Sequence, residues 1–146
     1  MGNMSRDKGQ RGERAVAKLL QPVIDKVKHD GDIQIVRNLD QTRDGGYDLK
    51  GVPWLAMEVK WQETLCVNTW WKQTIRQADD DQVPVLIYKQ NRKSWKVLMM
   101  GYVEIADGKR IKTRVQISLE AFLIWFEQKL IRSIGNERTR DGKSAE

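Results

Sequence analysis

The apolar run at residues 83–88 most constrains how this chain can fold. It reads Val83-Pro84-Val85-Leu86-Ile87-Tyr88 and contains no charged residue. A strand with apolar side chains on both faces is typical of the centre of a sheet that is covered on each side. The run therefore predicts a buried strand at the centre of a β-sheet.

Helices and further strands are predicted on both sides of this run. Apolar spacing and end signals predict helices at residues 9–29, 68–78 and 119–133. Pro22 should kink or split the first helix, and Gly135 should stop the last one. Alternating apolar residues between turn-forming segments predict strands at residues 33–37, 47–50, 54–61, 95–100 and 111–117.

The length of 146 residues suits one domain with a substantial core. We place this domain at residues 1–134 and expect its first eight residues to be frayed. The segment at residues 135–146 is polar and charged, and we predict an unstructured tail there.

A carboxylate and an ammonium group share one face of the strand predicted at residues 54–61. Glu58 and Lys60 lie two positions apart and project to the same side, while Val59 points to the core. Asp48 can reach them from the neighbouring strand if residues 51–53 form a turn. Two convergent carboxylates bind a hard divalent cation, and a lysine beside them can orient a water molecule. A solvated salt pair on an amphipathic strand is the alternative interpretation.

Glu13 lies on the apolar stripe of the first helix. It precedes Val16 by three residues and Leu20 by seven, so it should face the sheet. A carboxylate in that position needs a partner. An acidic residue that complements the helix dipole in the first turn is the other explanation.

Composition limits the partners and the chemistry. The net charge of +6 and a pI near 9.5 suit a polyanionic partner such as nucleic acid. Cys66 is the single cysteine and His29 the single histidine, so an internal disulfide and a zinc site of soft ligands are both excluded. No apolar run is long enough to span a membrane, and we expect a protein of the cytoplasm.

The order of these motifs resembles the PD-(D/E)xK nuclease superfamily, and within it the archaeal-type Holliday junction resolvases and their phage or prophage relatives. The resemblance extends from residue 8 to about residue 96. Its segments are Lys8-Gly9-Gln10-Arg11-Gly12-Glu13-Arg14, Gly46-Tyr47-Asp48-Leu49, Met57-Glu58-Val59-Lys60, Trp70-Trp71-Lys72-Gln73-Thr74 and Pro84-Val85-Leu86-Ile87. Tyr47 replaces the proline of the superfamily name.

The resemblance implies an α/β fold with a restriction-endonuclease-like mixed sheet flanked by helices. It also implies a homodimer that cleaves DNA with Mg²⁺, for which Mn²⁺ can substitute. Asp48 and Glu58 would be the metal ligands, together with the carbonyl oxygen of Val59. Lys60 would position the attacking water, and Glu13 would complete the site directly or through water.

Several further residues are candidates for the site or for DNA binding. Asp44 is an alternative candidate for the first metal ligand, but the Gly-Tyr-Asp-Leu sequence around Asp48 favours Asp48. Gln73 follows the catalytic strand on a helix, where several nuclease branches place a glutamine near the metal or the phosphate; an ordinary exposed helix residue is the alternative. The predicted DNA-binding residues gather at the start of the first helix and in the loop before Asp48: Lys8, Arg11, Arg14 and Arg43.

The predicted function is a magnesium-dependent DNA endonuclease that resolves four-way junctions. One alternative is a phage or restriction-like nuclease with broader DNA substrates. Another is a non-catalytic DNA-binding module that keeps the nuclease fold. A ribonuclease is compatible with the charge, but no motif favours it.

Overall fold

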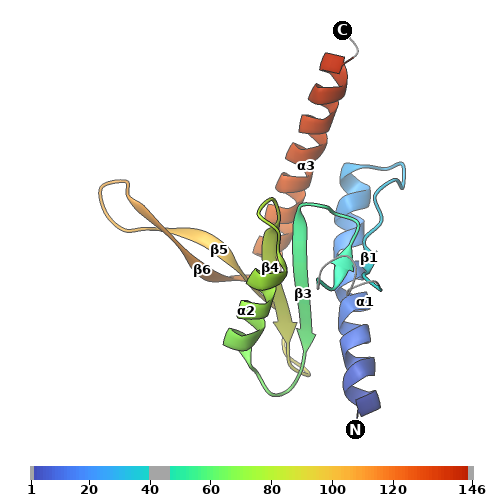
Figure 1. Cartoon of the computed structure of the whole chain (residues 1–146), viewed down its shortest axis with the longest axis vertical. Helices are drawn as coiled ribbons and strands as arrows, with labels where there is room; N and C mark the ends of the chain where they lie inside the picture. Colours follow the sequence, from blue (N-terminus) through green and yellow to red (C-terminus); the bar gives the residue numbers. More distant parts are fainter. Residues whose placement is uncertain (1, 40–46, 145–146) are drawn as a thin grey trace.

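A four-stranded mixed sheet forms the centre of the molecule (Figure 1). The computed structural model describes residues 2–39 and 47–144, with side chains described at residues 9–39 and 47–137. The strand order is β3–β4–β5–β6; β3 and β4 are parallel, and the other neighbours are antiparallel. The strands are β3 (Leu55–Trp61), β4 (Val83–Lys89), β5 (Lys96–Glu104) and β6 (Arg110–Ser118).

The predicted central strand is confirmed. β4 pairs with a strand on each side, and Val85, Leu86 and Ile87 are fully buried. A second, two-stranded antiparallel sheet pairs β1 (Val36–Arg37) with β2 (Leu49–Lys50).

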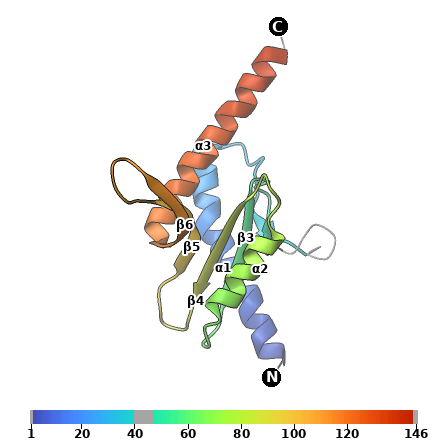
Figure 2. The same cartoon turned by 60° about the vertical axis from the view of Figure 1, so that its left-hand side comes forward.

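Helices cover both faces of the larger sheet (Figure 2). α1 (Gly2–Val27) and α3 (Leu119–Ser144) pack on the face that carries Met57, Val59 and Ile87. α2 (Val67–Gln77) packs on the opposite face, where Trp70 lies against Leu86 and Tyr88. The predicted mixed sheet flanked by helices is therefore confirmed.

The first helix is longer and less interrupted than predicted. It begins at Gly2, so the expected fraying of the first eight residues is wrong for the described backbone, and it continues through Pro22 to Val27 without splitting. Leu20 and Ile24 flank the proline and are both buried in the same core. Packing on both sides of Pro22 outweighs the loss of one helical hydrogen bond.

The last helix also extends beyond its predicted end. α3 runs through Gly135 to Ser144, so the prediction of an unstructured tail from residue 135 is wrong for the described residues up to 144. Gly135 keeps a helical backbone; it lacks the positive φ with which glycine normally ends a helix. Glycine in a helix interior costs only roughly 1 kcal/mol relative to alanine, so a helix can continue through it.

The turn between β2 and β3 positions the first predicted metal ligand. Gly51 has a φ of 122°, and a Cβ atom there would lie 2.0 Å from the carbonyl oxygen of Gln34. Only glycine fits this close approach. The turn expected at residues 51–53 therefore forms, and it brings Asp48 alongside β3.

Candidate active site

Asp48 is held against the edge of β3 that does not pair with β4. Its backbone N–H donates to the carbonyl oxygen of Met57 at 2.9 Å, and its Oδ2 accepts a hydrogen bond from the N–H of Val59 at 2.7 Å. The residue is 6% exposed. These contacts fix the carboxylate beside the middle of the strand that carries Glu58 and Lys60.

Glu58 and Lys60 project from the same face of β3, as predicted. They are in register with Leu86 and Tyr88, which face α2. The ammonium group of Lys60 lies 3.1 Å from Oε1 of Glu58. Glu58 is 3% exposed, and its Oε2 is buried without a hydrogen-bond partner among the described residues. Glu58 is therefore buried and Lys60 half-buried, unlike the solvated salt pair of the alternative interpretation.

Burial opposes ionisation of both carboxyl groups. Desolvation, followed by the charge of Glu58, raises the pKa of Asp48 to about 8, although the hydrogen bond from Val59 lowers it. Desolvation also raises the pKa of Glu58, and the ammonium group of Lys60 opposes this shift. Two buried carboxylates with one ammonium group are short of positive charge, a condition that a divalent cation relieves.

Glu13 approaches the same carboxyl groups from α1. Its charge contributes to the raised pKa of both Asp48 and Glu58. Its side chain is 15% exposed, in agreement with the inward orientation that was predicted. It accepts a hydrogen bond from Nε of Arg37 at 2.6 Å. Glu13 is thus oriented by a cation from β1.

Arg37 is a residue of this site that sequence reasoning missed. It lies at the end of the predicted strand at residues 33–37, 24 residues from its partner. The one available signal was the inward position of Glu13, because a carboxylate on a buried stripe requires a cation or hydrogen-bond donors.

The donor set fits a hard cation. Within the described part of the chain, no group of three or more His, Cys, Asp and Glu side chains is arranged to hold a metal ion. Asp48 and Glu58 nevertheless supply carboxylate oxygens, and Oε2 of Glu58 lacks a partner among the described residues. Oxygen ligands of this kind suit Mg²⁺, which binds proteins through one or two carboxylates and keeps several waters.

A cationic pocket borders the pair of Glu13 and Arg37. Its volume is about 560 Å³, and it combines apolar side chains with four cations: Arg14, Lys18, Arg37 and Lys50. Of these, only Arg14 was predicted to bind DNA. The pocket offers positive charge directly beside the candidate site.

The other predicted DNA-binding residues are not among the described residues that line this pocket. Arg11 is exposed, with its guanidinium carbon 5.6 Å from the ring centroid of Trp61. Lys8 lies within α1, but its side chain is outside the described side chains, and Arg43 and Asp44 are outside the described residues. Because α1 begins at Gly2, Lys8, Arg11 and Arg14 lie inside the helix, and their predicted position at its start is wrong.

α2 lies on the face from which Glu58 and Lys60 project. Gln73 is half-buried on this helix, and its predicted role stays a prediction. Gln77, one turn further on, has a buried Oε1 without a hydrogen-bond partner among the described residues.

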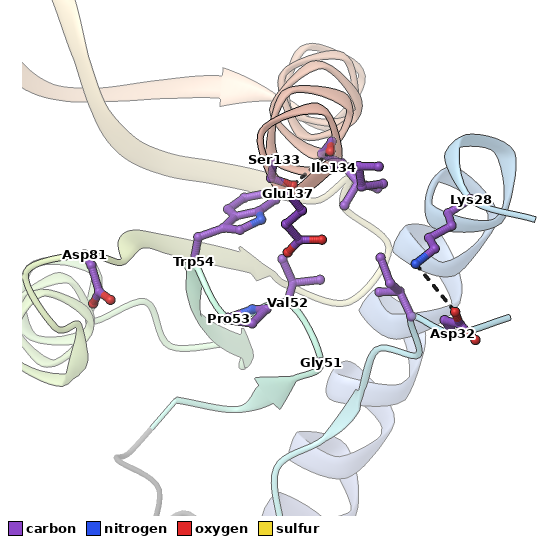
Figure 3. Close-up of a pocket in the computed structure, with 12 residues that line it drawn as sticks. Lys28, Asp32, Gly51, Val52, Pro53, Trp54, Asp81, Ser133, Ile134 and Glu137 are labelled. Carbon is purple, nitrogen blue, oxygen red and sulfur yellow. Dashed lines mark hydrogen bonds and ion pairs between the residues drawn. The ribbon is translucent and has the colours of Figure 1, made fainter. Parts of the chain in front are cut away.

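A different cavity lies away from this site. It has a volume of about 410 Å³ and is lined by residues from the segment that follows α1, the β2–β3 turn and α3, among them Lys28, Asp32, Trp54 and Glu137 (Figure 3). Neither Glu13, Asp48, Glu58 nor Lys60 lines it. The chemistry therefore does not belong to this cavity.

Among solved structures, the chain is similar to Hjc, a Holliday junction resolvase from Archaeoglobus fulgidus. The two sequences are 17% identical, the match covers 80% of this chain and 88% of that chain, and the TM-score is 0.44. A search among curated proteins gave no match. No helix in the described part of the chain has the length and apolar character to cross a membrane. Residues 4–124 match the family model described as "Phage putative PDDEXK endonuclease", so the chain belongs to this family of phage PDDEXK endonucleases.

Proposed function

We propose that this protein is a magnesium-dependent DNA endonuclease that hydrolyses phosphodiester bonds in branched DNA, with four-way junctions as its preferred substrate. The observation that carries the metal requirement is the buried pair of Asp48 and Glu58, in which one carboxylate oxygen lacks a partner among the described residues.

The proposed ligands are the carboxylates of Asp48 and Glu58 and the carbonyl oxygen of Val59. When bound, the cation supplies positive charge to the phosphate under attack and favours deprotonation of a water molecule. Mn²⁺ would be accepted by the same oxygen ligands.

Lys60 has the contacts of a positioning residue. Its ammonium group is fixed by Oε1 of Glu58, and its side chain is still 20% exposed. An ammonium group carries three protons, so it can donate to the carboxylate and to an attacking water at the same time. Glu13, oriented by Arg37, would hold the water shell from the opposite side, and Gln73 would contact the phosphate from α2.

The DNA backbone would lie over the cationic pocket. Arg14, Lys18 and Arg37 line it, and phosphate contacts of this kind position a strand without reading its sequence. The net charge of +6 favours the same partner. The preference for junctions is supported by the order of the sequence motifs, and a homodimer of such sites would match the two-fold shape of a junction.

The test compares a four-way junction with the linear duplexes of its arms. We expect symmetric nicks near the branch with Mg²⁺ or Mn²⁺, and no cleavage with EDTA. Glu58→Gln should bind the junction without cutting it, whereas Glu120→Gln, which changes an exposed glutamate on α3, should cut normally.

The other outcomes identify the alternatives. Equal cleavage of the junction and its arms would indicate a nuclease with broader DNA substrates. Binding without cleavage by the unmodified protein, with either metal, would indicate a DNA-binding module.

A further inference from the structure

The β5–β6 hairpin projects from the body of the molecule as a two-stranded arm (Figures 1 and 2). We use "the arm" for residues 101–114. Its strands stay in register to their ends, with Tyr102 opposite Lys112 and Glu104 opposite Arg110. Asp107 and Gly108 form its tip, both with positive φ, the backbone conformation of a tight hairpin turn.

The arm is exposed along most of its length. Val97, Leu98 and Met99 of β5 are buried, but every residue from 102 to 112 is exposed. Tyr102 is 63% exposed and Ile111 is 48% exposed. A two-stranded ribbon without a covering layer is at best marginally stable in water. We therefore expect the arm to have a binding partner.

The two faces of the arm differ in character. Side chains alternate between the faces of a strand, so the three cations Arg110, Lys112 and Arg114 share one face with Tyr102 and a single acidic residue, Glu104, while Val103 and Ile111 share the other. The guanidinium carbon of Arg110 lies 5.3 Å from the ring centroid of Tyr102. Nη1 of Arg114 donates to Oδ1 of Asn68 on α2 at 3.0 Å. These contacts orient two cations of the basic face.

The basic face is on the same side of the sheet as the candidate active site. Arg114 contacts α2, and Glu58 and Lys60 also project toward the α2 side. β3 and β6 are the two edges of the sheet, separated by three strand spacings of about 4.8 Å, or roughly 14 Å. The arm then extends further from this edge (Figure 1).

We propose that the arm binds a DNA helix of the substrate at a distance from the cleaved phosphate, through Arg110, Lys112 and Arg114. Alternating cations on a ribbon complement the charge of the phosphate backbone, and a two-stranded ribbon fits the major groove of B-DNA, which is about 12 Å wide. This inference rests on the proposed function, because it assumes that DNA is the substrate.

The experiment uses the full chain and two junctions with the same branch, one with long arms and one with short arms. The variant Arg110→Gln/Lys112→Gln should bind the long-armed junction about tenfold more weakly than the unmodified protein. The slope of log K against log[salt] should be smaller in magnitude by about 2, because two phosphate contacts are lost. Affinity for the short-armed junction and cleavage at saturating DNA should be unchanged.

Two matched variants separate charge from structure. Arg110→Lys/Lys112→Arg keeps both charges and should retain the affinity and the salt slope. Val103→Thr/Ile111→Thr changes the opposite face and should leave DNA binding unaffected. All variants should keep the melting temperature of the unmodified protein, because the altered side chains are exposed.

Unchanged affinity and salt slope in the glutamine variant would overturn the proposal. A change of oligomeric state in the threonine variant, combined with unchanged DNA binding in the glutamine variant, would also overturn it and identify a second copy of the chain as the partner. Failure of the unmodified protein to cleave DNA would refute the proposed function. The role of the arm is measured independently, as the difference in DNA binding between the variants.

Discussion

Nε of Arg37 lies 2.6 Å from Oε2 of Glu13 and joins the first helix to the small sheet, whose strand β2 directly follows Asp48. Both side chains are largely shielded from water, with 23% and 15% exposed. The charge of Glu13 raises the pKa of Asp48 and of Glu58, so the ion pair holds a third carboxylate near the candidate site. Arg37 thus connects the stability of the domain with its chemistry.

A double-mutant cycle should measure this connection. Arg37→Gln leaves a partly buried carboxylate without its cation, so we expect a lower free energy of unfolding and weaker cleavage. Glu13→Gln in the same background should recover part of the stability, with a coupling energy of about 1–3 kcal/mol by denaturant unfolding. Lys93→Gln, which changes an exposed cation in the turn between β4 and β5, is the control. Additive effects of the two substitutions would show that the pair does not contribute.

Glu58→Gln should separate stability from activity. The unmodified protein buries the carboxyl groups of Asp48 and Glu58 close together, and the amide cannot carry the negative charge of one of them. In EDTA we expect the variant to be more stable, by on the order of 1 kcal/mol, because functional sites commonly reduce stability. Cleavage should be lost. A variant that is less stable than the unmodified protein in EDTA would show that the ion pair with Lys60 outweighs the cost of burial.

The stability of the metal-free protein should fall as the pH rises. The carboxyl group of Asp48 loses its proton near its ordinary pKa of 3.8 when the chain is unfolded, but only near a pKa of about 8 when it is folded. Between these values the folded state holds the extra proton, so the free energy of unfolding decreases by up to about 1.4 kcal/mol per pH unit. The raised pKa of Glu58 acts in the same direction.

Thermal melts in EDTA between pH 5 and about 9 would measure this slope, and Asp48→Asn should reduce it. Addition of Mg²⁺ should stabilise the protein most at the alkaline end, because the ligands must lose their protons before they bind metal. A stability that is independent of pH in EDTA would contradict the pKa assigned to Asp48.

The parts of the fold that depend on strong local patterns were predictable. The apolar run in β4 identified the central strand, and the period of two in β3 placed Glu58 and Lys60 on one face. The pairing of Glu13 with Arg37 was not predictable, since it joins residues that only the tertiary fold brings together. β5 and β6 also run beyond their predicted ends, because continued pairing across the arm extends both strands past the core.

Two glycines should respond in opposite ways to alanine. Gly51 has a φ of 122°, and its added Cβ would meet the carbonyl oxygen of Gln34 at 2.0 Å. Gly51→Ala should therefore destabilise the protein by several kcal/mol, on the order of 3 kcal/mol. Because the β2–β3 turn holds Asp48 beside β3, this variant should also lose cleavage and the stabilisation by Mg²⁺.

Gly135→Ala is the matched control. Gly135 lies inside α3, and nothing stands within 4 Å of an added Cβ. Alanine loses less backbone entropy than glycine in a helix, so this variant should be more stable by about 0.5–1 kcal/mol with unchanged cleavage. Denaturant unfolding and a junction-cleavage assay test both variants together. A loss of stability in Gly135→Ala would mean that the helix ends at this glycine in solution, as its sequence alone suggested.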